Sequence, residues 1–447
     1  MTDETKKPDL SLSEIFNMNL GYLGVQFGWG LQLANMSAIY TILGAEPHEI
    51  SKLWIAGPVC GLLIQPLVGA MSDRTWTKLG RRRPYFLGGA ILASIALVLM
   101  PESSSIWVAF GILWLLDAST NVSHEPFRAF VADKLNRSQQ TLGFVFLSFF
   151  VGVGHSISSA MPRILAACGV VGEAANGIPL TVQYSFRMGA IGFLACILWT
   201  VFTATEYPPE DMEEFERKRR ENPGILGMFK EVFGEFPEAI RNMPLTMKQV
   251  GIVHMFTFIG LFCMWMFFSL TTCYHVFGAP DKDSQLFKEG VEWSGWCFAI
   301  YSMVCCLVSL CLSRLTKIFS RKLIHSVALI CGGISLLSIY FIKDPQILQF
   351  TMIGIGITWA STLSMPYAIL AAALPPGKYG VYMGLFNCAI VIPEVITAFL
   401  LEPLVKYGFN NNPLYVVMLG GVFLLVAAGS VYFVRDPLYE KENLVST

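Results

Sequence analysis

The sequence is poor in charged side chains. Asp, Glu, Lys and Arg make up 14% of the 447 residues, and hydrophobic residues make up 54%, whereas soluble domains usually carry about 25% charged residues. A water-soluble core cannot absorb so large an apolar excess, so we expect the chain to lie in a lipid bilayer. The formal net charge is −1, which argues against a nucleic-acid partner.

Metal-binding and catalytic patterns are lacking as well. The 11 Cys are scattered through apolar runs without the spacing of metal ligands, and none of the 6 His lies four residues from another. We therefore expect no metal and no cofactor, and we interpret the cysteines as small buried hydrophobic residues. A membrane enzyme would need a cluster of catalytic groups, so the sequence predicts that the protein is not an enzyme.

Long apolar segments, in contrast, are abundant. A helix needs about 20 mostly apolar residues to cross a bilayer. Segments of this kind are found near residues 15–38, 53–71, 84–101, 106–131, 141–168, 184–204, 249–274, 293–313, 323–342, 349–372, 380–403 and 414–434. These twelve candidates predict an all-α polytopic membrane protein. A charged interval at residues 205–248 divides these segments six and six. We therefore expect an N-terminal half of residues 1–204, a linker of residues 205–248 and a C-terminal half of residues 249–447.

Basic residues predict how the chain is oriented. If the N-terminus is cytoplasmic, 23 of the 31 Lys and Arg lie in the cytoplasmic segments, 5 lie in the opposite loops and 3 lie in or beside spans. Positively charged loops resist translocation, so both termini are expected in the cytoplasm. The halves also echo each other, because Pro126 and Gly143 in the first half correspond to Pro366 and Gly384 in the second. Two such halves form the major facilitator arrangement, with the substrate between them at the midplane.

The short loop DRTWTKLGRRRP crowds charges after the second span. It contains Asp73, Arg74, Gly80, Arg81 and Arg82. One interpretation is a topology signal that keeps the loop in the cytoplasm. The other is a cytoplasmic gate, in which the aspartate and arginines bridge to a helix end of the other half in one state and release it in another. The pattern G-x-x-x-D-R…G-R-R resembles the loop motif of the facilitator superfamily.

The fourth span carries the most informative stretch, LLDASTNVSHEPFR. At about 100° per residue, Asn121, His124 and Arg128 fall within about 40° of Asp117 on one helical face, and Glu125 lies about 80° away. A charge at the bilayer centre costs about 3 kcal/mol, so this face must meet water or internal partners. A purely structural ion pair between Asp117 and Arg128 is the alternative, but about 16 Å of helical rise separates the two residues.

Several motifs together resemble the sucrose-type proton symporters. These belong to the glycoside–pentoside–hexuronide and solute-carrier-45 branch of the major facilitator superfamily, and the chain looks like a bacterial member. The resemblance rests on VQFGWGLQL, WIAGPVCGLLIQPLVGAMSDR, LGRRRP, LLDASTN…PFRAFVAD and WASTLSMPYAILAAALP…GVYMGLFNCAIVIPEV. It implies that Asp117 carries the proton, that Arg128 is required for coupling, and that Asn387 belongs to the site.

The resemblance also implies two glutamines in the first span, Gln26 and Gln32. They are six residues apart, about 240° around a helix, so both can face one cavity only if Gly28 or Gly30 breaks the span. Glu394 departs from the family, because plant members carry Gln after the proline at that point. It is interpreted as a second proton site, as an acceptor for sugar hydroxyls, or as a buried neutral carboxyl.

A sugar offers hydroxyl groups and apolar ring faces, so its site needs amide and carboxylate groups together with aromatic plates. The candidates for substrate binding are Gln26, Trp29, Gln32, Asn121, Trp359, Phe386, Asn387 and Glu394. We expect a monomeric carrier in the plasma membrane, a bacterial inner membrane, that moves a disaccharide or glucoside with a proton. A sodium-coupled or uncoupled sugar carrier, or a membrane sugar sensor, are the alternatives.

Overall fold

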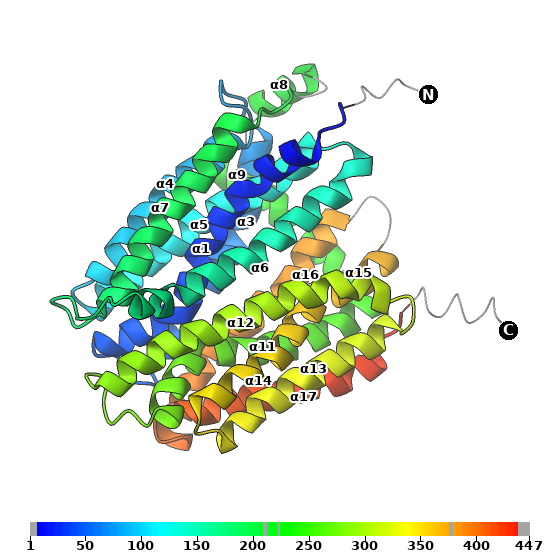
Figure 1. Cartoon of the computed structure of the whole chain (residues 1–447). Helices are drawn as coiled ribbons and strands as arrows, with labels where there is room; N and C mark the ends of the chain where they lie inside the picture. The colour runs from blue at the N-terminus through cyan, green and yellow to red at the C-terminus, as the bar shows by residue number, and fades with distance from the viewer. Residues whose placement is uncertain (1–6, 209–211, 222–223, 375–378, 437–447) are drawn as a thin grey trace.

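The computed structural model describes residues 7–208, 212–221, 224–374 and 379–436, whose regular structure is helical (Figure 1). Long helices dominate both parts of the chain. The first part contains α1 (Leu12–Ile42), α2 (Ile50–Leu53), α3 (Ala56–Asp73), α4 (Arg83–Leu99), α5 (Ile106–Lys134), α6 (Arg137–Ala167) and α7 (Leu180–Thr203). We call these helices the N-half.

Three short helices, α8 (Met212–Arg220), α9 (Gly224–Gly234) and α10 (Phe236–Arg241), form the connection to the second part. That part, here called the C-half, contains α11 (Leu245–Thr271), α12 (Gln285–Leu315), α13 (Arg321–Ser338), α14 (Pro345–Thr362), α15 (Met365–Ala373), α16 (Tyr379–Pro403) and α17 (Pro413–Ser430). Short π-helical turns extend α11 and α16 at Thr272–Val276 and Leu404–Gly408.

Eleven helical segments of the described chain are long and apolar enough to cross a membrane. They correspond to the second through twelfth predicted segments. The first predicted segment forms α1, a helix of 31 residues that is not among the eleven. Four buried amide side chains lower its hydropathy, namely Asn19, Gln26, Gln32 and Asn35.

The two halves repeat one pattern of helix packing. In the N-half, α1 packs on α6 and α7, α4 packs on α5 and α7, and α3 packs on α5. In the C-half, α11 packs on α16 and α17, α13 packs on α14 and α17, and α12 packs on α14. Figure 1 shows the blue-to-green N-half lying beside the green-to-red C-half, with both chain ends on the same side.

Glycine and proline have different effects in two spans. α1 runs without a break through Gly28 and Gly30, so the condition under which Gln26 and Gln32 would both face one cavity is not met. These glycines instead allow close packing, since a Cβ on Gly30 would lie 2.0 Å from Ser158 Oγ. The tenth span is interrupted between α14 and α15, where Pro366 occupies the first turn of α15. A proline has no N–H group to continue the preceding helix, and its ring clashes with the carbonyl four residues earlier, which explains the break there.

Candidate functional site

Asp117 lies in the interior of the N-half, on the face of α5 that meets α1 and α3. Its side chain is 1% exposed. Gln32 Nε2 on α1 donates a hydrogen bond of 3.3 Å to Asp117 Oδ2. A Cβ on Gly57 of α3 would lie 3.7 Å from the same oxygen, so this glycine leaves room for the carboxyl. The carboxyl therefore faces neighbouring helices, and the group that donates this hydrogen bond is a neutral amide rather than a cation.

The polar stripe predicted on α5 continues below Asp117 with specific partners. Asn121 accepts a hydrogen bond of 2.6 Å from Gln65 on α3 and donates one of 2.8 Å to the carbonyl of Asp117. His124 Nε2 lies 2.5 Å from the hydroxyl of Tyr22 on α1. The indole ring of Trp29 meets the same imidazole edge-on, with 4.7 Å between the ring centroids. The stripe thus faces α1 and α3, not lipid.

Arg128 forms the lower end of this stripe. Its side chain is 52% exposed and lies 3.8 Å from the Glu125 carboxylate. The helix continues through Pro126 between them. Arg128 is therefore half-exposed and lies near Glu125, whereas Asp117, about 16 Å away along the helix by helical rise, is buried. The described ion pairs do not include a buried Asp117–Arg128 pair.

The two glutamines of α1 face different neighbours because the helix is unbroken. Gln32 points at Asp117 on α5, whereas the Cβ of Gln26 lies against Gly154 of α6. Gln26 is 1% exposed, and its Nε2 has no hydrogen-bond partner among the described residues. A buried donor without a partner is costly, so this amide is available to a ligand or a water molecule.

The corresponding helices of the C-half contribute aromatic rings instead of polar groups. Trp359 of α14 packs edge-on against Trp265 of α11, with ring centroids 5.2 Å apart, and lies 6.0 Å from the ring of Phe258. Phe386 of α16 is 1% exposed. Its ring packs at 4.7 Å on His254 of α11, so Phe386 belongs to a buried cluster in this structure.

α16 supplies the two remaining predicted site residues. Asn387 is half-buried. Glu394 is 7% exposed, and no described side chain donates a hydrogen bond to its carboxyl. The helix is continuous through Pro393, which precedes this glutamate. A buried carboxyl without a partner is unfavourable when it is charged.

Bonds between the halves gather on the side opposite the chain ends, which we call the opposite side. Ser37 Oγ of α1 donates to the carbonyl of Met266 on α11 at 2.5 Å, and Ser269 Oγ of α11 donates to the carbonyl of Ala34 at 3.0 Å. Farther out, Lys52 and Glu402 form an ion pair between α2 and α16. These contacts close the opposite side.

The side that carries the chain ends and most Lys and Arg, here called the basic side, contains a cavity of about 900 Å³ between the halves. Phe144 and Ser148 of α6 line one wall, and Ser309 and Ser313 of α12 and Ser364 line the other. Higher along the same two helices the gap is closed, since Ser156 Oγ donates to the carbonyl of Ala299 at 3.1 Å. The halves therefore diverge toward the basic side.

The loop between α3 and α4 forms a charged cluster within the N-half. Asp73 pairs with Arg81 and, at 2.6 Å, with Arg82. Arg82 also pairs at 3.0 Å with Asp133 in the last turn of α5. Arg74 donates to the carbonyl of Ala70 at 3.2 Å in the preceding turn. The contacts named here all lie within the N-half, so the cluster ties α3, α4 and α5 together.

Glu206 completes this cluster. Its carboxylate accepts hydrogen bonds of 2.8 to 3.0 Å from the backbone N–H groups of Arg81, Arg82 and Arg83 at the start of α4. Gly80 has φ +109°, and a Cβ there would lie 2.8 Å from the Glu206 carboxyl. Helix N-termini attract anions, which explains the position of this glutamate.

Sequence reasoning missed Glu206, Asp133 and Gln65. Glu206 and Asp133 lie far from the loop in sequence. The available signal was that each is an acidic residue at the end of a predicted span. Gln65 lies on α3, in an otherwise apolar span. A single amide side chain in such a span was the signal that could have identified a partner for the polar stripe on α5. Tyr22 was missed because a tyrosine in a membrane span gives no distinct signal.

Known proteins resemble this chain in sequence. A "Sucrose transport protein SUC4" of Arabidopsis thaliana is 26% identical over 461 residues, covering 90% of this chain and 88% of that protein. A "Sucrose transport protein SUT2" of Oryza sativa subsp. indica is 29% identical over 462 residues, covering 90% and 89%.

Solved structures share the fold at lower identity. The nucleoside transporter NupG superposes with a TM-score of 0.69 at 12% identity, covering 94% of this chain and 98% of the other. A D-xylose-proton symporter superposes with a TM-score of 0.63 at 13% identity, covering 95% and 99%. These relatives are transporters and not enzymes, as predicted. The profile of the Major Facilitator Superfamily matches residues 18–398 and 279–444, and the chain is therefore a multi-pass membrane protein that belongs to this superfamily.

Proposed function

We propose that the protein is a proton-coupled symporter of a disaccharide or glucoside, of the sucrose or maltose type, that works by alternating access. The observation that carries the proposal is Asp117, a buried carboxyl that accepts a hydrogen bond from the amide of Gln32. A carboxyl in such a place is stable when protonated, and it can release its proton when water reaches it. The similarity to plant sucrose transport proteins supports a sugar as the substrate.

We further propose that α1 is a twelfth membrane-crossing helix and that the basic side is cytoplasmic. The length of α1 exceeds what a bilayer requires, and its buried amides face α5 and α6 rather than lipid. Both termini then lie in the cytoplasm of a plasma membrane, a bacterial inner membrane for the branch that the motifs resemble. The protein acts as a monomer in this proposal.

The structure then corresponds to the state that is open to the cytoplasm. The bonds of Ser37, Ser269 and Lys52 hold the extracellular side closed, while the cavity between α6 and α12 opens on the other side. Transport requires that these contacts break and that the halves close over the cytoplasmic cavity. The cluster of Asp73, Arg81 and Arg82 acts as the cytoplasmic gate by engaging the C-half in that second state.

The sugar is held between a polar wall and an aromatic wall. Gln26, Gln32 and Asn121 present amide groups from α1 and α5, and Trp29 and Trp359 present ring faces. Asn387 and Glu394 complete the hydroxyl contacts from α16, and Phe386 joins them when its cluster opens. A proton on Asp117 removes the charge that would otherwise oppose closure around an uncharged sugar. Arg128 then favours release of the proton on the cytoplasmic side, because its cation stabilises the carboxylate through the wet part of the stripe.

Glu394 is the second proton site in this proposal. The Glu394 side chain is buried, and no described side chain donates a hydrogen bond to its carboxyl. Glu394→Gln separates this role from that of Asp117, because the number of protons moved per sugar falls from two to one if both carboxyls take part. The Asp117→Asn variant loses coupling in either case.

The experiment that tests the proposal is sugar uptake into vesicles that contain the purified protein. An inward proton gradient is expected to drive accumulation, an uncoupler to abolish it, and removal of sodium to leave it unchanged. Accumulation that depends on sodium, or equilibration that no ion gradient drives, would establish the sodium-coupled or uncoupled carrier instead. Binding without any transport would identify a sensor, and a panel of di- and monosaccharides would identify the sugar.

A further inference from the structure

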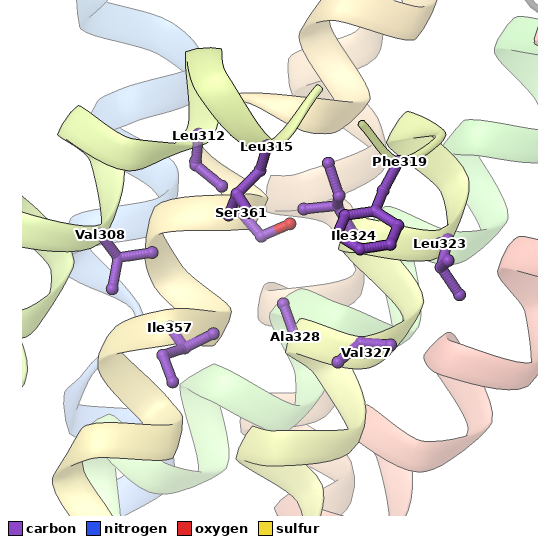
Figure 2. Close-up of a pocket in the computed structure, with 10 residues that line it drawn as sticks. All are labelled: Val308, Leu312, Leu315, Phe319, Leu323, Ile324, Val327, Ala328, Ile357 and Ser361. Carbon is purple, nitrogen blue, oxygen red and sulfur yellow. The ribbon is translucent and has the colours of Figure 1, made fainter. Parts of the chain in front are cut away.

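A second cavity, of about 300 Å³, lies in the C-half between α12 and α13, close to the basic side (Figure 2). The two helices each pack along α14 but scarcely touch each other. They therefore leave a groove whose floor is α14, lined by Leu315, Phe319, Leu323, Val327 and Ile357 among others. This groove is separate from the sugar site that is proposed between the halves.

The groove suits an acyl chain. Nine of its ten lining residues are aliphatic or aromatic, and Ser361 carries the one oxygen that Figure 2 shows among the side chains. That hydroxyl is already engaged, because it lies 2.9 Å from His325 Nδ1. A volume of 300 Å³ would hold about ten water molecules at ~30 Å³ each, but walls without free polar groups do not retain water.

The walls of the groove also face the lipid-exposed perimeter. Phe319, Leu323 and Val327 are 48%, 50% and 49% exposed. In a membrane-spanning protein, this exposed surface meets acyl chains rather than water. The acyl chains of bilayer lipids can therefore enter the groove from the membrane.

Cations surround the mouth of the groove. Arg314 and Lys317 lie in and just after the last turn of α12 and are exposed. Arg321 and Lys322 begin α13, where their side chains donate to the carbonyls of Ala368 and Tyr432 and so keep their full charge. The sequence contains no Asp or Glu from residue 293 to residue 343. Nothing in this segment neutralises the positive field at the mouth.

We propose that this groove binds one acyl chain of an anionic phospholipid from the leaflet on the basic side, with the phosphate beside Arg314 and Lys317. An apolar slot topped by cations that form no ion pair among the described residues matches the two parts of such a lipid. The bound lipid borders the large cavity between the halves, because Leu312 lines both spaces. It therefore sits where the end of α12 must move when the cavity closes.

The test measures lipid retained by the purified full-length protein with native mass spectrometry. Phosphatidylglycerol and phosphatidylcholine with identical oleoyl chains serve as probes. The wild-type protein is expected to bind phosphatidylglycerol at least tenfold more tightly. Val327→Trp fills the groove from an exposed position and is expected to weaken this binding at least tenfold. Ile330→Trp is the matched control, since Ile330 is 39% exposed on the same helix but does not line the groove.

The headgroup contact is tested separately. Arg314→Gln with Lys317→Gln is expected to reduce the affinity for phosphatidylglycerol about fivefold for each lost cation, to the level of phosphatidylcholine. Arg219→Gln with Lys248→Gln removes two cations elsewhere on the basic side and is expected to change little. A phosphatidylglycerol with a photoreactive group in its acyl chain is expected to label α13 and α14 peptides within residues 308–361.

Three outcomes would overturn the proposal. The first is equal binding of phosphatidylglycerol to the wild-type protein and to Val327→Trp, with labelling elsewhere. The second is equal affinity for the two lipids, which would show that the groove does not select an anionic headgroup. In the third, Val327→Trp alters the oligomeric state and not lipid binding, which would make the groove a contact between copies of the chain. Unchanged thermal midpoints for both Trp variants serve to verify that the protein remains folded.

Discussion

Gln32 on α1 donates a hydrogen bond of 3.3 Å to Asp117 on α5. This bond joins two helices of the N-half at a carboxyl that is almost fully buried. It holds the proposed proton site against the helix that also carries Gln26 and Trp29. A change in the protonation of Asp117 therefore acts directly on α1 through this bond. α1 also packs on α11 across the interface between the halves.

The first prediction concerns this bond. Gln32→Leu removes the donor of the hydrogen bond to Asp117. Leaving a buried polar group unsatisfied costs about 1–3 kcal/mol, so we expect the initial rate of proton-driven sugar uptake to fall about tenfold. Gln32→Asn, which keeps an amide but shortens it, should retain part of the rate. Equal rates for the wild-type protein and Gln32→Leu would show that the bond has no part in transport.

The second prediction concerns the neighbouring glutamine. Gln26 Nε2 is buried and has no described partner, so Gln26→Leu breaks no hydrogen bond in the empty protein. If the amide serves a sugar hydroxyl, the KM for sugar should rise about tenfold while the thermal midpoint stays the same or increases. Titration of the initial uptake rate with sugar measures the KM. An unchanged KM would remove Gln26 from the substrate site.

The third prediction concerns the cap on α4. Glu206→Ala removes the acceptor for three backbone N–H groups. Because bonds to a charged group are strong and their loss leaves donors unsatisfied, we expect a decrease of about 3 kcal/mol in the free energy of unfolding. Gly80→Ala should act in the same direction, since its φ of +109° and its contact with Glu206 leave no room for a Cβ. Thermal unfolding in detergent tests both, and an unaltered midpoint would contradict the assignment.

The fourth prediction concerns closure of the opposite side. Lys52→Gln removes the ion pair with Glu402. Partly exposed pairs contribute at most about 1 kcal/mol, so the population of the state open on that side should increase about fivefold at most. Hydrogen–deuterium exchange in residues 43–53 and 402–412 reports this opening. The exchanged pair, Lys52→Glu with Glu402→Lys, should restore slow exchange, and failure to do so would mean that the pair does not hold the halves together.

The sequence predicted the parts of this structure that depend on periodicity and composition. The apolar segments located the long helices, and the angular spacing of Asp117, Asn121 and His124 placed them on one inward face. Both features follow from helix geometry alone, so no knowledge of tertiary contacts was needed.

The features that sequence reasoning missed depend on contacts between distant segments. Glu206 is 125 residues from Arg81, and nothing near either residue predicts that the two meet. Whether Gly28 or Gly30 breaks α1 could not be predicted either, because glycines in membrane helices serve close packing as readily as they serve breaks. Here the two glycines pack against Thr120 and Ser158. The choice between those roles requires the neighbouring helices.

The most direct test of the account is proton movement that accompanies sugar in vesicles containing the wild-type protein or Asp117→Asn. A potential of 100 mV is worth about 2.3 kcal/mol per charge, so each proton moved with a sugar contributes a factor of about 50 to the accumulation. We expect the wild-type protein to accumulate sugar and move protons with it. Asp117→Asn should still exchange labelled for unlabelled sugar but neither accumulate it nor move protons. Concentrative, proton-linked uptake by Asp117→Asn would contradict the central claim.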